Sequence, residues 1–198
     1  MSRVILRPPT PADEDRFLAA MRASKRAHRP WLYPPLDSAA YRMYLARLDN
    51  DRKFGYLACR RDDDEIVGWL NISEIVRGAL QGAFLGYGGV AAHMGQGYMT
   101  EAVQLVVREA FGPLGLHRLE ANIQPGNLAS IALARRCGFE KEGFSPRYLK
   151  VGGRWRDHER WAIRADQRRP ARSSSASSAS NVEEAASAAS NGAAARGA

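Results

Sequence analysis

Gly95-Gln96-Gly97-Tyr98-Met99-Thr100-Glu101 is the stretch around which the rest of the chain is interpreted. Residues 85–91 before it are apolar and broken by glycines, which predicts a strand, and residues 102–111 after it predict a helix. The first N–H groups of a helix have no partner within the helix, and the helix dipole favours negative charge there. Glycines also let the backbone approach a phosphate closely. This order indicates an anion site, although on the glycines alone a tight turn without a ligand is the stronger interpretation.

Two common phosphate-binding motifs are incomplete in this stretch. No Gly-Lys-Ser/Thr follows, so the Walker pattern is absent, and the dinucleotide pattern lacks its third glycine because position 100 is Thr100. A phosphate ligand here is therefore expected to belong to neither a nucleoside triphosphate nor NAD.

Further motifs follow at defined spacings on both sides of this stretch. Together with Gly95-x-Gly97-Tyr98-x-Thr100-Glu101-Ala102 they are Asn127-x-x-Ser130, Cys137-Gly138-Phe139 with Glu142-Gly143, Tyr148-Leu149, Gly153-x-Trp155-x-Asp157-His158 and, upstream, His28-Arg29-Pro30-Trp31 and Arg77-Gly78. In these motifs the chain resembles the GNAT family of acyl-CoA-dependent N-acetyltransferases. It resembles most closely the RimJ/RimL branch, which acetylates the N-terminal amine of ribosomal proteins. The resemblance covers roughly residues 3–165, and the order and spacing of the motifs carry it.

The alternation of apolar segments and turns predicts a mixed α/β fold. The resemblance implies the GNAT arrangement, a central, mostly antiparallel sheet that splays at one parallel pair and is flanked by helices. Thr10 is expected to cap a helix starting at Pro11, and Ser38 a second helix, with irregular residues 24–35 between them. The expected strands cover residues 4–6, 54–60, 66–72, 83–90, 118–123, 139–150 and 155–164, and the later helices residues 102–111 and 128–136.

The chain is expected to hold one domain and an appendage. Residues 1–170 form the acetyltransferase domain in this interpretation, and the length of 198 residues suits it. Residues 171–198 are dominated by Ser and Ala and have few large apolar side chains. Such a segment cannot bury enough surface to offset its ordering entropy, so we expect a disordered tail without a catalytic role.

The formal net charge is +8, and the expected tail contributes nothing to it because its two Arg and two Glu cancel. A basic domain attracts polyanions, among them the phosphates of CoA, ribosomal RNA and acidic protein tails. The alternative is a merely basic surface, since no Lys/Arg block with interleaved aromatic residues is present. DNA is therefore not an expected partner.

The compartment is expected to be the cytoplasm. The first seven residues are too short and too charged for a signal peptide, and no apolar run approaches the length of a membrane span. Cys59 and Cys137 are expected to be reduced, packed thiols. We expect no membrane association, and a monomer or a homodimer.

The resemblance implies acetyl-CoA as cosubstrate. The backbone of Gly95, Gln96, Gly97, Tyr98, Met99 and Thr100 would take the pyrophosphate, and Asn127 would contact the cofactor. An N–H group near Val90 or Ala91 would face the thioester oxygen. The family usually has Arg or Gln where this chain has Met94, which removes one side-chain contact. No metal is expected, because the acidic triplet at residues 62–64 fits a solvated turn better than a metal site.

Two residues are the candidate catalytic groups. By the resemblance, Ser130 would protonate the departing CoA thiolate, and its alternative role is in the cap of the helix that Asn127 begins. The Glu that acts as base in some RimL proteins corresponds here to Arg147, so Glu120 is the substitute, with a structural ion pair as its alternative. An α-amine is about a tenth neutral at pH 7, against about 0.04% for a lysine amine, so an N-terminal acceptor can react through a water relay.

The expected acceptor is the N-terminal α-amine of a protein, and the resemblance implies a ribosomal protein. His28, Trp31 and Tyr33 are the expected acceptor contacts, and packing within the domain is the alternative for Trp31. A small amine such as a polyamine or an antibiotic is the second candidate. A non-catalytic CoA-binding or ribosome-binding module is the third. An acidic lining of the acceptor cleft would favour a cationic small amine, whereas an open groove beside Trp31 and Tyr33 would favour a peptide.

Overall fold

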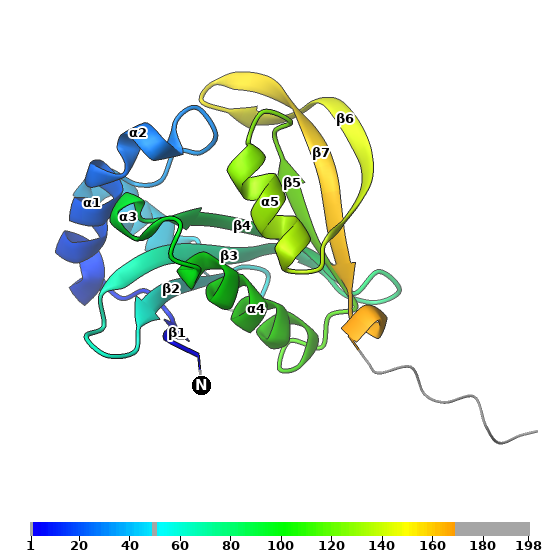
Figure 1. Ribbon diagram of the computed structural model, residues 1–198, viewed down its shortest axis with the longest axis horizontal. Coiled ribbons are helices and arrows are strands. Elements are labelled where there is room, and N and C mark those ends of the chain that lie inside the picture. Colours follow the sequence, from blue (N-terminus) through cyan, green and yellow to red (C-terminus); the bar gives the residue numbers. More distant parts are fainter. Residues whose placement is uncertain (1, 49–50, 169–198) are drawn as a thin grey trace, which may run out of the picture. The chain divides into compact units, whose positions relative to one another are not determined.

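The computed structural model describes residues 2–48 and 51–168. Seven strands form one sheet in the order β1-β2-β3-β4-β5-β7-β6, with helices on both faces (Figure 1). The expected tail, residues 171–198, and the boundary at residue 170 lie outside the described residues. The elements are β1 Val4–Arg7, η1 Pro11–Asp13, α1 Glu14–Ala23, α2 Lys25–His28, α3 Ser38–Ala46, β2 Phe54–Arg60, β3 Ile66–Val76, β4 Gly82–Gly89, η2 Ala91–His93, α4 Tyr98–Phe111, β5 Arg118–Ile123, α5 Leu128–Arg136, β6 Glu140–Val151, β7 Arg154–Arg164 and η3 Asp166–Arg168.

The sheet is antiparallel except at one neighbouring pair, β4 and β5. These two strands share three residue pairs, Gly82 with Arg118, Ala83 with Leu119 and Phe84 with Glu120. Beyond Phe84 and Glu120 both strands continue, β4 along β3 and β5 along β7, without pairing to each other. The predicted mixed α/β fold with a sheet splayed at a parallel pair is therefore confirmed.

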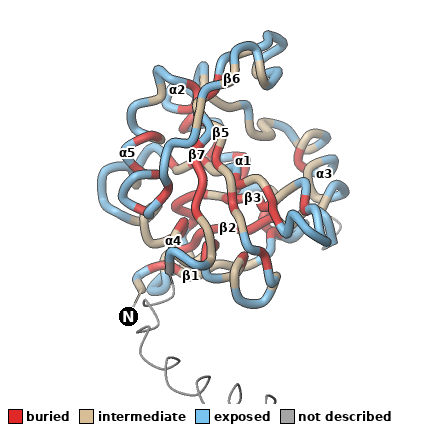
Figure 2. The backbone as a smooth tube through the Cα atoms, turned by 90° about the vertical axis from the view of Figure 1, so that its right-hand side faces the viewer, coloured by how far each residue is buried: buried red, intermediate tan, exposed pale blue. Residues whose placement is uncertain are grey.

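Two apolar cores lie on opposite faces of the sheet. The alternation within β2 shows the division, because Tyr56 and Ala58 belong to one core and Leu57 and Cys59 to the other. The buried faces of α4 and α5 pack in the first core, and those of α1 and α3 in the second. The buried residues are concentrated in the central strands (Figure 2). The sheet edge opened by the splay thus has helical layers on both sides.

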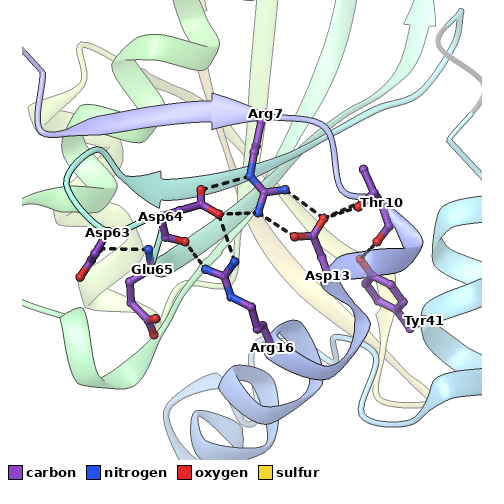
Figure 3. Close-up of polar contacts among 8 residues, drawn as sticks. All are labelled: Arg7, Thr10, Asp13, Arg16, Tyr41, Asp63, Asp64 and Glu65. Atoms are coloured by element: carbon purple, nitrogen blue, oxygen red, sulfur yellow. Dashed lines mark hydrogen bonds and ion pairs between the residues drawn. The ribbon is translucent and has the colours of Figure 1, made fainter.

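An ion-pair network fixes α1 against the strands (Figure 3). Arg7 at the end of β1 donates from both terminal nitrogens to the Asp13 carboxylate, at 2.9 and 2.6 Å, and also contacts Asp64 in the β2–β3 turn. Arg16 on α1 donates to the same Asp64 at 3.0 Å. The hydrogen bonds from Arg7 hold the pKa of the Asp13 carboxyl at about 2. The acidic triplet of residues 62–64 therefore supplies anchors for arginines.

The N-terminal helices differ from prediction in two details. Thr10 caps the short η1 that leads into α1, as expected, but α3 is capped by Asp37 instead of Ser38. The Asp37 carboxylate accepts the Ala40 N–H at 2.8 Å, and a carboxylate there also suits the helix dipole. The segment predicted to be irregular contains the one-turn helix α2, which has no apolar periodicity to reveal it.

Candidate active site

A cleft of about 160 Å³ lies where β4 and β5 separate. It is lined by Leu32, Trp69, Leu85, Gly86, Tyr87, Ala121, Asn122, Ile123, Gln124, Asn127 and Ser130. Two polar atoms of this lining, Trp69 Nε1 and Asn122 Oδ1, are buried without a hydrogen-bond partner in the described structure. Unpaired buried polar groups cost free energy, so a ligand that brought an acceptor and a donor to these two atoms would be stabilised. An amide provides both.

Ser130 and Asn127 meet at the start of α5, on the wall of this cleft. Asn127 Oδ1 accepts the Ser130 N–H at 3.2 Å, so the helix-cap interpretation of the motif is confirmed. The Ser130 hydroxyl is left for another partner and lies 2.8 Å from the Tyr87 hydroxyl. The cap therefore places a hydroxyl in the cleft, and the two interpretations of this motif are compatible.

Tyr87 is a cleft residue that the sequence does not single out. A tyrosine within an apolar strand is most simply interpreted as part of the core, and only the pairing of β4 across to α5 brings it to Ser130. Burial raises the pKa of Tyr87 to about 12. Its hydroxyl is thus protonated at neutral pH and can donate a hydrogen bond to Ser130 Oγ.

The backbone N–H groups expected to face a thioester, those of Val90 and Ala91, are already donated within the protein. Val90 N–H donates to Val67 O at 2.9 Å, and Ala91 N–H to Ser24 Oγ at 2.9 Å. The prediction for these two groups is therefore corrected. Because successive residues of a strand turn their N–H groups to opposite edges, those of Gly89 and Tyr87 face the splayed edge of β4.

His28 supports the end of β4 from within. It is 3% exposed, and its Nε2 lies 2.8 Å from Gly89 O. Burial lowers the pKa of His28, so the ring is neutral at pH 7 and donates Nε2–H to that carbonyl. The structure thus buries His28 against the Gly89 carbonyl. Gly89 turns its carbonyl and its N–H to the same edge of β4, the one opened by the splay, so the expected acceptor contact of His28 stays a prediction.

Trp31 and Tyr33 lie on the α2–α3 loop and tie it to two other elements. The Trp31 ring packs on Gly126, and the Trp31 carbonyl accepts from Gln124 Nε2 at 3.1 Å. The Tyr33 ring lies so close to Gly152 in the β6–β7 turn that no Cβ would fit there. Both rings therefore also serve packing, the alternative considered for Trp31, while Tyr33 stays 43% exposed.

A second cavity of about 440 Å³ adjoins the cleft, and Trp69 lines both. Its walls come from α1, the α2–α3 loop, α3, the start of β2 and β3, and they include Phe17, Tyr33, Leu36, Met43, Tyr44 and Asn71. Asp37 is its one acidic lining residue, and that carboxylate caps α3. Arg47 and Lys53 supply positive charge. The sequence points to Tyr33 alone, because the other walls come together only through tertiary packing.

The glycine loop has the backbone that its sequence predicts. Gly95 and Gly97 have φ of +78° and +86°, and α4 begins directly afterwards at Tyr98. The Tyr98 ring lies under the Arg3 guanidinium, and Met99 lies against the backbone of Gly68 and Gly89. These two side chains are used in packing, so backbone N–H groups are what the loop can offer to an anion.

Glu120 belongs to a surface ion-pair network and does not line the cleft. Its carboxylate accepts from Arg118 Nε at 2.9 Å, and Arg118 also pairs with Glu142. The alternative, a structural ion pair, is what the structure shows, so the assignment of Glu120 as base is corrected. No Asp, Glu or His is found among the residues that line the cleft.

Among the described residues, no three His, Cys, Asp or Glu side chains gather in a way that could hold a metal ion. None of the described helices combines the length and the apolar character required to cross a membrane.

Residues 3–140 match the model of the acetyltransferase (GNAT) domain family. The chain belongs to the GNAT acetyltransferases. Among curated GNAT relatives, probable N-acetyltransferase YjcK of Bacillus subtilis (strain 168) is 44% identical over 61% of this chain and 66% of its own length. The [ribosomal protein uS5]-alanine N-acetyltransferase of Escherichia coli (strain K12) is 39% identical over 56% of this chain and 57% of its own length. The chain thus spans less than two thirds of the length of these relatives.

A solved structure extends the GNAT match over most of the chain. It is Mycobacterium smegmatis RimJ in complex with CoA-disulfide, with a TM-score of 0.77 and 30% identity, and the match covers 84% of each chain. This coverage is larger than the range of residues 3–140 that the family model matches.

Proposed function

We propose that this chain is an acetyl-CoA-dependent N-acetyltransferase whose acceptor is the N-terminal α-amine of a protein, with a ribosomal protein as the favoured target. The observation that carries the proposal is the cleft at the β4–β5 splay, which holds the Ser130–Tyr87 hydroxyl pair and opens at Trp69 toward a larger pocket. The similarity to RimJ and to the uS5-alanine acetyltransferase supports both the reaction and the acceptor class.

Acetyl-CoA would lie across the splay. The N–H groups of residues 95–99 would hold the pyrophosphate at the start of α4, whereas the Thr100 N–H already donates to Gly97 O at 3.0 Å. The pantetheine arm would then enter the gap between β4 and β5, where its amides can pair with Trp69 Nε1 and Asn122 Oδ1. The N–H groups of Tyr87 and Gly89 face the same edge and are the candidates to stabilise negative charge on the thioester oxygen.

Ser130 would supply the proton for the leaving group. The acceptor nitrogen attacks the thioester carbonyl carbon, the C–S bond breaks, and the thiolate takes the Ser130 hydroxyl proton. The Tyr87 hydroxyl, 2.8 Å away, can return a proton to Ser130 and regain one from solvent. Each proton that leaves the amine is thus balanced by one delivered to the thiol.

The absence of a carboxylate or imidazole from the cleft lining favours an α-amine over a lysine amine. At pH 7 an α-amine is about a tenth neutral, which is enough for a water relay to remove the one proton that the amine loses on acetylation. A lysine amine is about 0.04% neutral and would need a strong base.

The charge of the larger pocket favours a peptide over a polyamine. A polycation would require several carboxylates, whereas Asp37 is the single acidic lining residue and Arg47 and Lys53 are basic. Aromatic walls and a pocket of about 440 Å³ suit the first residues of a peptide chain.

We further propose a cytoplasmic location, a catalytic domain of residues 1–170 and a tail of residues 171–198 that is dispensable for catalysis.

The test is acetyl transfer by the purified protein, followed by mass spectrometry of the acceptor. We expect acetylation at the α-amine of peptides copied from the N-termini of ribosomal proteins, with spermidine and aminoglycosides as comparison acceptors. Ribosomal proteins from cells with and without the gene should differ at one N-terminus by one acetyl group. Turnover of small amines alone would refute the acceptor class, and CoA binding without any turnover would identify a non-catalytic module.

A further inference from the structure

Arg3, just before β1, reaches across to the glycine loop and the first turn of α4. Its guanidinium donates from Nη2 to Gln96 O at 3.0 Å and from Nε to Glu101 Oε1 at 2.7 Å. Its backbone N–H donates to Glu101 Oε2 at 2.7 Å, and its guanidinium carbon lies 4.6 Å from the centre of the Tyr98 ring. One residue therefore contacts the loop, the helix and the aromatic ring between them.

The bond to Gln96 O controls the direction of a neighbouring N–H. In a trans peptide the carbonyl oxygen of one residue and the N–H of the next point in opposite directions. By holding Gln96 O toward itself, Arg3 turns the Gly97 N–H to the other side of the loop. Gly97, which has a positive φ, forms one side of this peptide, and glycine has more backbone freedom than other residues, so a contact from Arg3 limits the orientations the peptide can take.

The bonds to Glu101 remove a charge that opposes an anion. Glu101 is the acidic residue in the first turn of α4. A carboxylate there competes with a phosphate for the positive end of the helix dipole. The Arg3 guanidinium and N–H engage both carboxylate oxygens, and the Ser2 hydroxyl adds a third donor at 3.0 Å.

We propose that Arg3 is a positioning residue for the pyrophosphate of acetyl-CoA, acting by orienting the Gly97 N–H and neutralising Glu101. The inference rests on the proposed function, because it requires the cofactor to bind at residues 95–100. Arg3 thus brings a guanidinium to the loop from the segment before β1.

The test compares Arg3→Ala with the unmodified enzyme. We expect the calorimetric Kd for CoA and the KM for acetyl-CoA to rise about tenfold. The kcat at saturating acetyl-CoA should stay within about twofold, because the acetyl group reacts at the other end of the cofactor. Arg3→Lys, which keeps the charge and one donor, should recover part of the affinity. With acetyl-pantetheine, which lacks the pyrophosphate, Arg3→Ala and the unmodified enzyme should have equal kcat/KM.

Arg108→Ala is the matched control, since it removes an exposed arginine from the other end of α4 and should leave the Kd unchanged. An Arg3→Ala enzyme with unchanged CoA affinity, or with an equal loss toward acetyl-pantetheine, would overturn the inference. The Gly97→Val variant distinguishes a failure of the cofactor site from a failure of the role given to Arg3. If it abolishes CoA binding while Arg3→Ala does not, the cofactor site stands and the role of Arg3 falls. If neither variant affects binding, the cofactor lies elsewhere.

Discussion

Replacing Ser130 with alanine should slow the chemical step and leave cofactor binding nearly unchanged. Ser130 Oγ lies in the cleft, 2.8 Å from the Tyr87 hydroxyl, and its own N–H is held by the Asn127 cap. A general acid contributes about 10²–10⁴ to the rate, and a thiolate is a fairly good leaving group, so we expect the low end. A loss of about 10² in kcat corresponds to about 2.7 kcal/mol of transition-state stabilisation. The KM for acetyl-CoA should stay constant, because the proton moves only as the C–S bond breaks.

The stability cost of the same change is small by comparison. Alanine removes one hydroxyl–hydroxyl bond, worth about 1 kcal/mol, and keeps the backbone cap intact. The Tyr87 hydroxyl retains a weaker contact to Ser130 O at 3.4 Å. A melting curve within a few degrees of the unmodified protein should therefore accompany the loss of rate.

Steady-state release of CoA thiol is the assay, and Tyr87→Phe is the partner variant. If the two hydroxyls act as one relay, the double variant should be about as slow as Ser130→Ala alone, since effects within one unit do not add. A kcat for Ser130→Ala within about threefold of the unmodified enzyme would remove Ser130 from the mechanism and leave solvent as the proton source. Full additivity of the two losses would refute the relay.

Three other predictions concern the cofactor loop, the tail and the N-terminal network. Gly97→Val should weaken CoA binding severely in calorimetry, because valine does not tolerate a φ of +86° and its Cβ would lie 3.2 Å from Arg3 Nη2; unchanged affinity in a folded variant would contradict the loop assignment. A chain ending at Pro170 should keep its melting temperature and turnover, and a fall of many degrees would mean that residues 171–198 dock. Asp13, whose pKa is about 2, should contribute about 2 kcal/mol above pH 4 that is lost as pH falls toward 2. The stability advantage of the unmodified protein over Asp13→Asn in denaturant titrations should therefore shrink by that amount between pH 7 and pH 2, and a constant difference would refute this assignment.

The order of elements and the glycine loop could be predicted from the sequence because both are local. Apolar periodicity marks α4, and two glycines mark a turn that needs positive φ. The splay could be expected only through resemblance to a family, since no local pattern reports which strands pair. The candidate role of Ser130 could be predicted in the same way, from the resemblance and from its spacing to Asn127.

The parts of the site that the sequence did not reveal depend on contacts between distant residues. Tyr87 meets Ser130 across 43 positions, and Ser24 takes the Ala91 N–H across 67. Glu120 faces away from the apolar side of β5, as its strand position predicts, but the neighbour on that face is Arg118 two residues earlier. Propensity and periodicity do not contain these distances, so they do not reveal that the N–H groups of Val90 and Ala91 and the carboxylate of Glu120 have partners within the protein.

The three residue pairs between β4 and β5 are a narrow seam in the backbone hydrogen bonding of the sheet. On one side of this seam, strands β1 to β4 pair with their neighbours along most of their length, and on the other side strands β5, β7 and β6 do the same. Amide protons that face the splay, such as those of Tyr87 and Gly89, have no strand partner across it and should exchange with solvent faster than those of the ladders. A ligand lying in the splay would give both half-sheets a shared neighbour. Its binding should then slow hydrogen exchange in both half-sheets together. Well above the Kd, the free energy of unfolding should rise with the logarithm of the ligand concentration.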